Sequence, residues 1–126
     1  MTQDERGVVL LAEADPVIGL DLTDALELAG YRVTGPIQTA AEAEAWLSRQ
    51  RPTLAVIDAV LTDGSSAGLV QRLRQRGVPF LVHAAPGDYR QLAEAFAGAP
   101  CLTRPAWPGD VVDLVGQLAQ PAAIPC

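Results

Sequence analysis

Lysine is absent from this sequence. All nine basic residues are arginine, and there are 15 acidic residues. Any chemistry that needs a primary side-chain amine must therefore be done without one. The formal net charge of -6 argues against a broad electrostatic grip on nucleic acid or on an anionic membrane surface. We accordingly predict no nucleic-acid partner and no membrane partner, and expect the chain to bind a protein or a small ion.

Cysteine and long apolar runs are also scarce. The two cysteines, Cys101 and Cys126, have no spacing typical of a disulfide framework or a metal cage. The longest apolar run, residues 54–61, is interrupted by Asp58 and is far too short to span a membrane. The N-terminus, Met-Thr-Gln-Asp-Glu-Arg, lacks the basic start and apolar continuation of a signal peptide. These features predict a cytoplasmic protein.

One domain is the expectation for 126 residues of which 49% are hydrophobic. No repeat, low-complexity stretch or break in composition interrupts residues 7–120. We predict a single domain over residues 7–120, with tails at residues 1–6 and 121–126.

Short apolar runs alternate with segments of helical periodicity. Asp15 precedes Pro16 in the manner of a helix N-cap, and Gly30 follows as a stop signal. Thr39 and Glu42 have the spacing of a capping box that begins a second helix. The predicted strands cover residues 8–12, 31–34, 54–57, 78–82 and 101–102, and the third and fourth helices lie around residues 69–76 and 88–97.

Five strands alternating with helices indicate a parallel sheet, because parallel neighbours need a crossover connection. We predict an α/β, flavodoxin-like, doubly wound sheet of order 2-1-3-4-5 with helices on both faces. Ligands of such sheets bind beyond the carboxyl ends of the strands, where the order reverses between strands one and three. The loops that begin at Glu13 and Asp58 lie at this point.

Two carboxylates at the ends of neighbouring strands can hold a hard cation such as Mg2+. The alternative is that Glu13 and Asp58 are strand-end acids that serve turns or helix amides. The predicted fold favours the cation site.

The order and spacing of four sequence blocks resemble a receiver domain of two-component response regulators. The blocks are VVLLAEADPVIGLDLTDALELAGYRVTGP, PTLAVIDAVLTDGSS, GVPFLVHA and APCLTRPAWPGDV, and they cover nearly the whole chain. The resemblance implies that Asp58 is the phosphoacceptor. It also implies that Glu13 begins the acidic pair and that the backbone carbonyl of Val60 is a third Mg2+ ligand. Residues 77–87 are closest to the FAT GUY subgroup, single-domain receivers common in bacteria.

Several receiver positions are replaced in this chain. Ala14 stands where the family has its main aspartate ligand to Mg2+, and Ala84 stands where a hydroxyl residue bonds the phosphoryl group. Arg104 replaces the lysine before Pro105, and its planar fork would suit a bidentate pair with Asp58. The aromatic switch position is Cys101. The resemblance therefore implies a degenerate receiver, and any Mg2+ site would be weak or vestigial.

Three further residues leave alternatives open. His83, the only histidine, could bond Asp58 or Glu13, although a purely structural role is the commoner one for a lone histidine. Trp46 is expected in the core, and Trp107 either covers the pocket mouth or anchors a surface. The resemblance also implies that the Arg104-Pro105 peptide bond can be cis, whereas most peptide bonds before proline are trans.

The leading functional hypothesis is a stand-alone response-regulator receiver that signals through protein contacts, with weak or no phosphorylation at Asp58. It is a binding module rather than an enzyme, and its expected partner is a histidine kinase or another signalling protein. Val17 and Leu20 on the first helix form a mildly apolar stripe for this contact. The alternative is packing against a last helix, whose predicted buried face comprises Val111, Leu114, Val115 and Leu118. The rivals are a working phosphoacceptor fed by a histidine kinase and a flavodoxin-like small-molecule domain. The second rival lacks a glycine-rich phosphate loop after the first strand.

Overall fold

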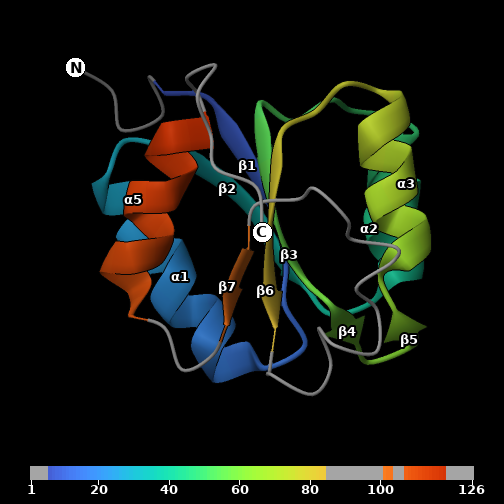
Figure 1. Cartoon of the computed structure of the whole chain (residues 1–126), viewed down its shortest axis with the longest axis horizontal. Coiled ribbons are helices and arrows are strands. Elements are labelled where there is room, and N and C mark those ends of the chain that lie inside the picture. Colours follow the sequence, from blue (N-terminus) through green and yellow to red (C-terminus); the bar gives the residue numbers. More distant parts are fainter. Residues whose placement is uncertain (1–5, 85–100, 104–106, 119–126) are drawn as a thin grey trace.

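Helices and strands alternate along the chain in the computed structural model, which describes residues 6–84, 101–103 and 107–118 (Figure 1). The elements are β1 (Val8–Ala12), α1 (Pro16–Leu28), β2 (Arg32–Ile37), α2 (Ala40–Leu47), β3 (Leu54–Asp58), β4 (Val60–Leu61), β5 (Gly64–Ser65), α3 (Ala67–Gln75), β6 (Phe80–Ala84), β7 (Cys101–Thr103) and α5 (Pro108–Leu118). The helix predicted at residues 88–97 lies outside the described residues. No described helix is long and apolar enough to cross a membrane.

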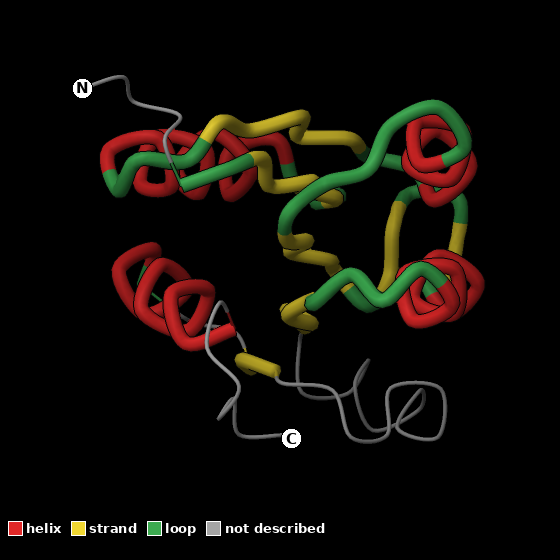
Figure 2. Tube along the Cα trace, turned by 90° about the horizontal axis from the view of Figure 1, so that it is seen from above, coloured by secondary structure: helices red, strands yellow, loops and turns green. Residues whose placement is uncertain are grey.

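The main sheet has five parallel strands in the order β2-β1-β3-β6-β7. This is the predicted order 2-1-3-4-5, with β6 and β7 as the fourth and fifth strands, so the prediction of the fold is confirmed. Helices α1 and α5 cover one face of the sheet, and α2 and α3 cover the other (Figure 2). The order reverses between β1 and β3, whose carboxyl ends lie side by side.

Alternation along the central strands divides the core into two clusters. Leu10, Ala55 and Ile57 pack with α2 and α3, whereas Leu11 and Val56 pack with α1 and α5. Each of these side chains is at most 1% exposed. Strands buried on both faces are typical of a parallel sheet, and they explain why the strands of this sequence are continuous apolar runs.

The predicted helix caps are confirmed. The carboxylate of Asp15 accepts hydrogen bonds from the backbone N–H groups of Val17 and Ile18, at 2.8 and 3.3 Å. The hydroxyl of Thr39 accepts one from the N–H of Glu42 at 3.1 Å. These bonds satisfy amides at the start of α1 and α2 that have no partner within the helix.

The main differences from the prediction concern the start of β6, the end of β2 and the segment after β3. Strand β6 begins at Phe80 rather than at residue 78, because the N–H of Val78 returns to the carbonyl of Leu73 and Pro79 has no N–H to donate. Strand β2 continues through Gly35-Pro36, and a register shift between Leu10 and Ala12 of β1 accommodates the irregularity. The segment after β3 adds a small antiparallel hairpin, β4 and β5, that was not predicted.

Candidate functional site

A polar row crosses the carboxyl ends of the three central strands. Asp58 ends β3 and lies directly opposite His83 of β6, while Glu13 follows the last residue of β1. All three side chains are buried, at 1%, 2% and 1% exposure for Asp58, His83 and Glu13. Because side chains alternate along a strand, each continues the sheet face that packs on α1 and α5. The structure therefore places Glu13 and Asp58 at the same edge of the sheet, at the point where the strand order reverses.

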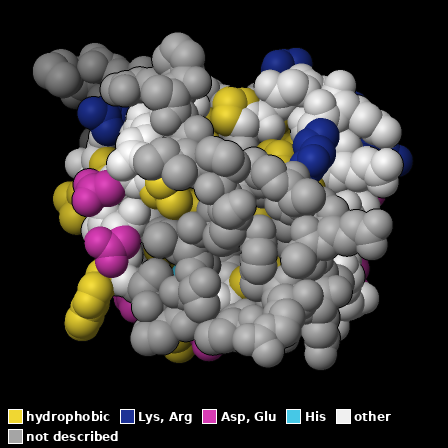
Figure 3. Space-filling model, viewed as in Figure 1, with side chains coloured by type: hydrophobic (Ala, Val, Ile, Leu, Met, Phe, Trp, Pro, Cys, Tyr) yellow, Lys and Arg dark blue, Asp and Glu magenta, His cyan; other side chains and the backbone are white. Residues whose placement is uncertain are grey.

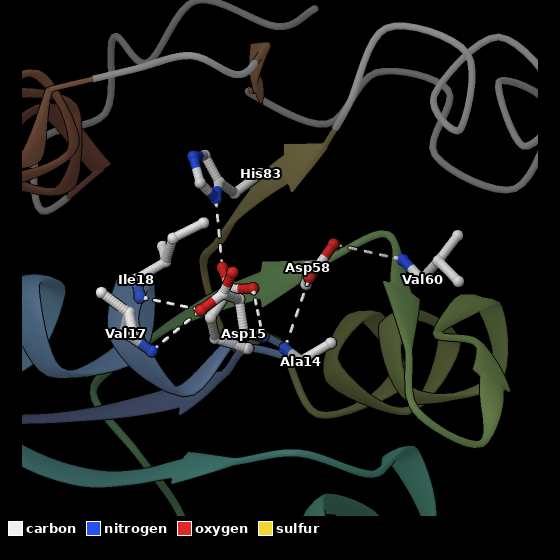
Figure 4. Close-up of polar contacts among 8 residues, drawn as sticks. Ala14, Asp15, Val17, Ile18, Asp58, Val60 and His83 are labelled. Atoms are coloured by element: carbon white, nitrogen blue, oxygen red, sulfur yellow. Dashed lines mark hydrogen bonds and ion pairs between the residues drawn. The ribbon is translucent and has the colours of Figure 1, made fainter.

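The carboxylate of Asp58 accepts two backbone hydrogen bonds (Figure 4). The N–H of Ala14 donates to its Oδ2 at 3.4 Å, and the N–H of Val60 donates to its Oδ1 at 3.3 Å. One donor belongs to the loop after β1 and the other to the start of β4. These bonds link the acid to both loops that border the switch point.

The carboxylate of Glu13 is engaged by different groups. Its Oε2 accepts a hydrogen bond from the N–H of Asp15 at 3.2 Å, and its Oε1 lies 3.3 Å from Nδ1 of His83. Figure 4 shows one ring nitrogen of His83 turned toward the loop after β1 and the other turned away from Asp58. Of the two partners that the sequence left open for His83, the structure thus places Glu13 in contact with it.

The replaced positions lie around this row. Ala14 is half-buried and packs on the α2 and α3 side, and Ala84 is the fully buried last residue of β6. Both offer a methyl group, which neither coordinates a cation nor donates a hydrogen bond. Cys101 pairs with Val82 through the backbone of β7. Arg104 and its bond to Pro105 lie outside the described residues.

The loops at this edge are fastened to one another by contacts that the sequence analysis missed. The side-chain amide of Gln38 donates to the carbonyl of Ala14 at 3.1 Å. The carbonyl of Gln38 in turn accepts from the N–H and the hydroxyl of Thr62, at 3.0 and 2.9 Å. No sequence signal marks these partners, since they depend on loops that meet only in the fold. The loop after β1 is therefore held from the α2 side.

Asp63 provides the second missed contact, because it caps α2 from the hairpin. Its two oxygens accept hydrogen bonds from the N–H groups of Ala40 and Ala41, at 2.8 and 3.1 Å. These bonds favour the charged form, so they hold the pKa of the Asp63 carboxyl below its usual value, although the side chain is exposed. The hairpin of β4 and β5 is thereby tied to the start of α2.

We expect Asp63→Asn to destabilise the domain at neutral pH and to make less difference in acid. A carboxyl group whose pKa is lowered by folding stabilises the fold above its unfolded pKa, and this contribution disappears as the pH falls through the folded pKa. The measurement is the free energy of unfolding in urea of both proteins from pH 7 to pH 2. A difference between them that stays constant over this range would contradict the assignment.

Comparisons with known proteins support the fold but supply no close relative, since neither a family model nor a curated protein matches the sequence. The structure is similar to the signal receiver domain of a histidine kinase from Syntrophus aciditrophicus, with 25% identity and a TM-score of 0.77 over 90% of this chain and 89% of that one. It is also similar to SdrG from Sphingomonas melonis Fr1, with 25% identity and a TM-score of 0.78 over 95% and 100%.

A third similarity, to the inactive form of the regulatory domain of the repressor of iron transport regulator RitR, reaches a TM-score of 0.83 over 94% of this chain and 98% of that one. At 14% identity it bears on the fold alone. All three likenesses extend over most of both chains, so they bear on the whole fold. The chain has the fold of the receiver domains of two-component response regulators.

Proposed function

We propose that this receiver domain signals through protein contacts and takes up phosphate at Asp58 weakly or not at all. The observation that carries the proposal is the pair of methyl groups, Ala14 and Ala84, that flank an otherwise well-placed acid. We also propose that the chain belongs to the FAT GUY subgroup of receivers, on the basis of residues 77–87.

Phosphoryl transfer depends on positioning and on neutralising charge, and a receiver contributes both through Mg2+ and polar side chains. Asp58 itself is positioned by the N–H groups of Ala14 and Val60. Few groups can hold the Mg2+ that would neutralise the charge, since residue 14 has no carboxylate and the oxygens of Glu13 contact Asp15 and His83. The chain retains the acid and has methyl groups at two positions where the resemblance implies a metal ligand and a hydroxyl donor.

Mg2+ fits this arrangement poorly. The ion takes six oxygen ligands in near-octahedral geometry and is held in proteins by one or two carboxylates. Within residues 6–84, 101–103 and 107–118, no three His, Cys, Asp or Glu side chains gather closely enough to hold a metal ion. We infer that Glu13, Asp58 and the carbonyl of Val60 form at most a weak site.

The contact surface that we propose lies on α1. Val17 and Leu20 are 67% and 60% exposed on successive turns of this helix, and Leu28 is 86% exposed near its end. Trp107, directly before α5, is 79% exposed and lies on the surface. Figure 3 shows hydrophobic side chains protruding at the edge of the molecule where α1 and α5 lie in Figure 1.

Apolar side chains at this spacing suit docking against another helix. Receiver domains pair with histidine kinases in two-component systems, and we propose a helix of a kinase, or of another signalling protein, as the partner of Val17 and Leu20. Packing of these two residues against α5 was the alternative. Their exposure disfavours it, because side chains packed between two helices would be buried.

Because Asp58 is retained, the second candidate function is that of an ordinary phosphoacceptor. We expect the natural chain, incubated with acetyl phosphate and Mg2+, to show little phosphorylation by intact-mass spectrometry beyond the blank given by Asp58→Asn. Near-complete conversion of the natural chain, absent from Asp58→Asn, would favour the phosphoacceptor and sink the proposal.

A further inference from the structure

We propose that His83 is a positioning residue that withholds Glu13 from a divalent cation. The proposal rests on the proposed function and deepens it, since it names a second cause of a weak Mg2+ site besides the methyl group of Ala14. His83 acts through Glu13 and has no described contact with Asp58, although the two are neighbours in the sheet.

The geometry of Glu13 carries the first step. A carboxylate that ligates Mg2+ must direct at least one oxygen to the ion. Here Oε1 lies 3.3 Å from Nδ1 of His83, and Oε2 accepts the N–H of Asp15 at 3.2 Å. Oε2 thus already has a donor, and with the proton on Nδ1 the ring of His83 occupies one of the lone pairs through which Oε1 could bind a cation.

Burial carries the second step. Glu13 is 1% exposed and His83 is 2% exposed, so water cannot readily replace the contact between them. A buried carboxylate that loses a donor is left with an unsatisfied oxygen, which costs more than the same loss at the surface. The contact therefore competes with a cation more strongly than an exposed hydrogen bond would.

The ring of His83 supplies the third step. Its other nitrogen, Nε2, is buried and has no hydrogen-bond partner in the described part of the chain. Burying an unpartnered polar atom is unfavourable, and an apolar side chain at the end of β6 would avoid it. The contact with Glu13 is the described interaction that offsets this cost, and it requires the proton of a neutral ring to be on Nδ1.

Two variants whose side chains branch in the same way separate this role from simple packing. Leucine at position 83 cannot donate, whereas asparagine carries an amide N–H close to the place of Nδ1. We expect His83→Leu to bind Mg2+ about tenfold more tightly than the natural chain, the size of a net hydrogen bond to a charged group. We expect His83→Asn to bind it as weakly as the natural chain does.

The affinity is measured by titrating each 15N-labelled protein with Mg2+ and following the amide signals of Ala14, Asp15 and Val60. Adding Glu13→Gln to His83→Leu provides the control, because the gain is expected to vanish when the released carboxylate is absent. Equal affinities of the natural chain and His83→Leu would overturn the proposal, as would a gain that survives Glu13→Gln.

The natural chain provides a test that does not depend on a variant folding. The imidazole nitrogen shifts of His83 are expected to place the proton of the neutral ring on Nδ1, and a proton on Nε2 alone would overturn the proposal. Failure here leaves the proposed function standing. That function fails separately, if the natural chain is itself phosphorylated efficiently.

Discussion

Ala14→Asp is expected to raise the affinity for Mg2+ at least about a hundredfold, because it adds a carboxylate ligand beside that of Asp58. The N–H of Ala14 donates to Oδ2 of Asp58, which places residue 14 beside the acid. Without Mg2+ the two carboxylates would repel each other, so the variant is also expected to gain stability on adding the ion. Isothermal titration calorimetry and melting curves with and without Mg2+ measure both effects.

Ala14→Asn is the matched control for this variant, since it has nearly the same shape without the charge. We expect it to bind Mg2+ far more weakly than Ala14→Asp. If Ala14→Asp binds no better than the natural chain, residue 14 is not the missing ligand, and the assignment of this position from the family resemblance is wrong.

Gly35→Ala is expected to destabilise the domain by about 3 kcal/mol or more, through backbone strain and overpacking together. Gly35 has a φ of +126°, which side-chain-bearing residues rarely adopt, and a Cβ atom there would lie 2.4 Å from the backbone carbonyl oxygen of Leu11. Leu11 belongs to the strand that leads to Glu13, so the strain would act at the edge of the site.

Gly64→Ala provides the comparison, because Gly64 has a similar φ of +119° with no atom within 4 Å of the added Cβ. The strain is then present without the clash, and about 1 kcal/mol is expected. Chemical unfolding of both variants measures the difference. Equal losses would contradict the close contact of Gly35 with Leu11.

Most of the fold could be predicted from the sequence because its signals are local. The apolar runs that form β1 and β3, the cap at Asp15 and the break at Gly30 each depend on a few neighbouring residues. Parallel pairing then follows from the alternation of strands and helices. The predicted start of β6 was wrong because the N–H of Val78 bonds to the carbonyl of Leu73 at the end of α3 and does not join the strand.

The place of the candidate site in the fold could be predicted from the sequence. Glu13 and Asp58 follow from the switch-point rule, and the structure brings their loops together. The partner of His83 was not predictable, because Asp58 lies on the neighbouring strand of the expected sheet and Glu13 follows the strand beyond it, and the choice between them depends on how the side chains are oriented. The cap that Asp63 gives to α2 was also missed. Sequence patterns for helix caps involve residues close to the helix in sequence, whereas Asp63 lies 22 and 23 residues from the amides that it caps.

The most direct test of the central claim compares phosphoryl uptake at Asp58 by the natural chain and by the triple variant Ala14→Asp, Ala84→Thr, Arg104→Lys. Each change restores a group that the receiver resemblance implies: a metal ligand, a hydroxyl donor and a lysine. With acetyl phosphate and Mg2+, the phosphoprotein yield by intact-mass spectrometry is expected to be high for the triple variant and close to the Asp58→Asn blank for the natural chain. A natural chain that matches the triple variant would contradict the account.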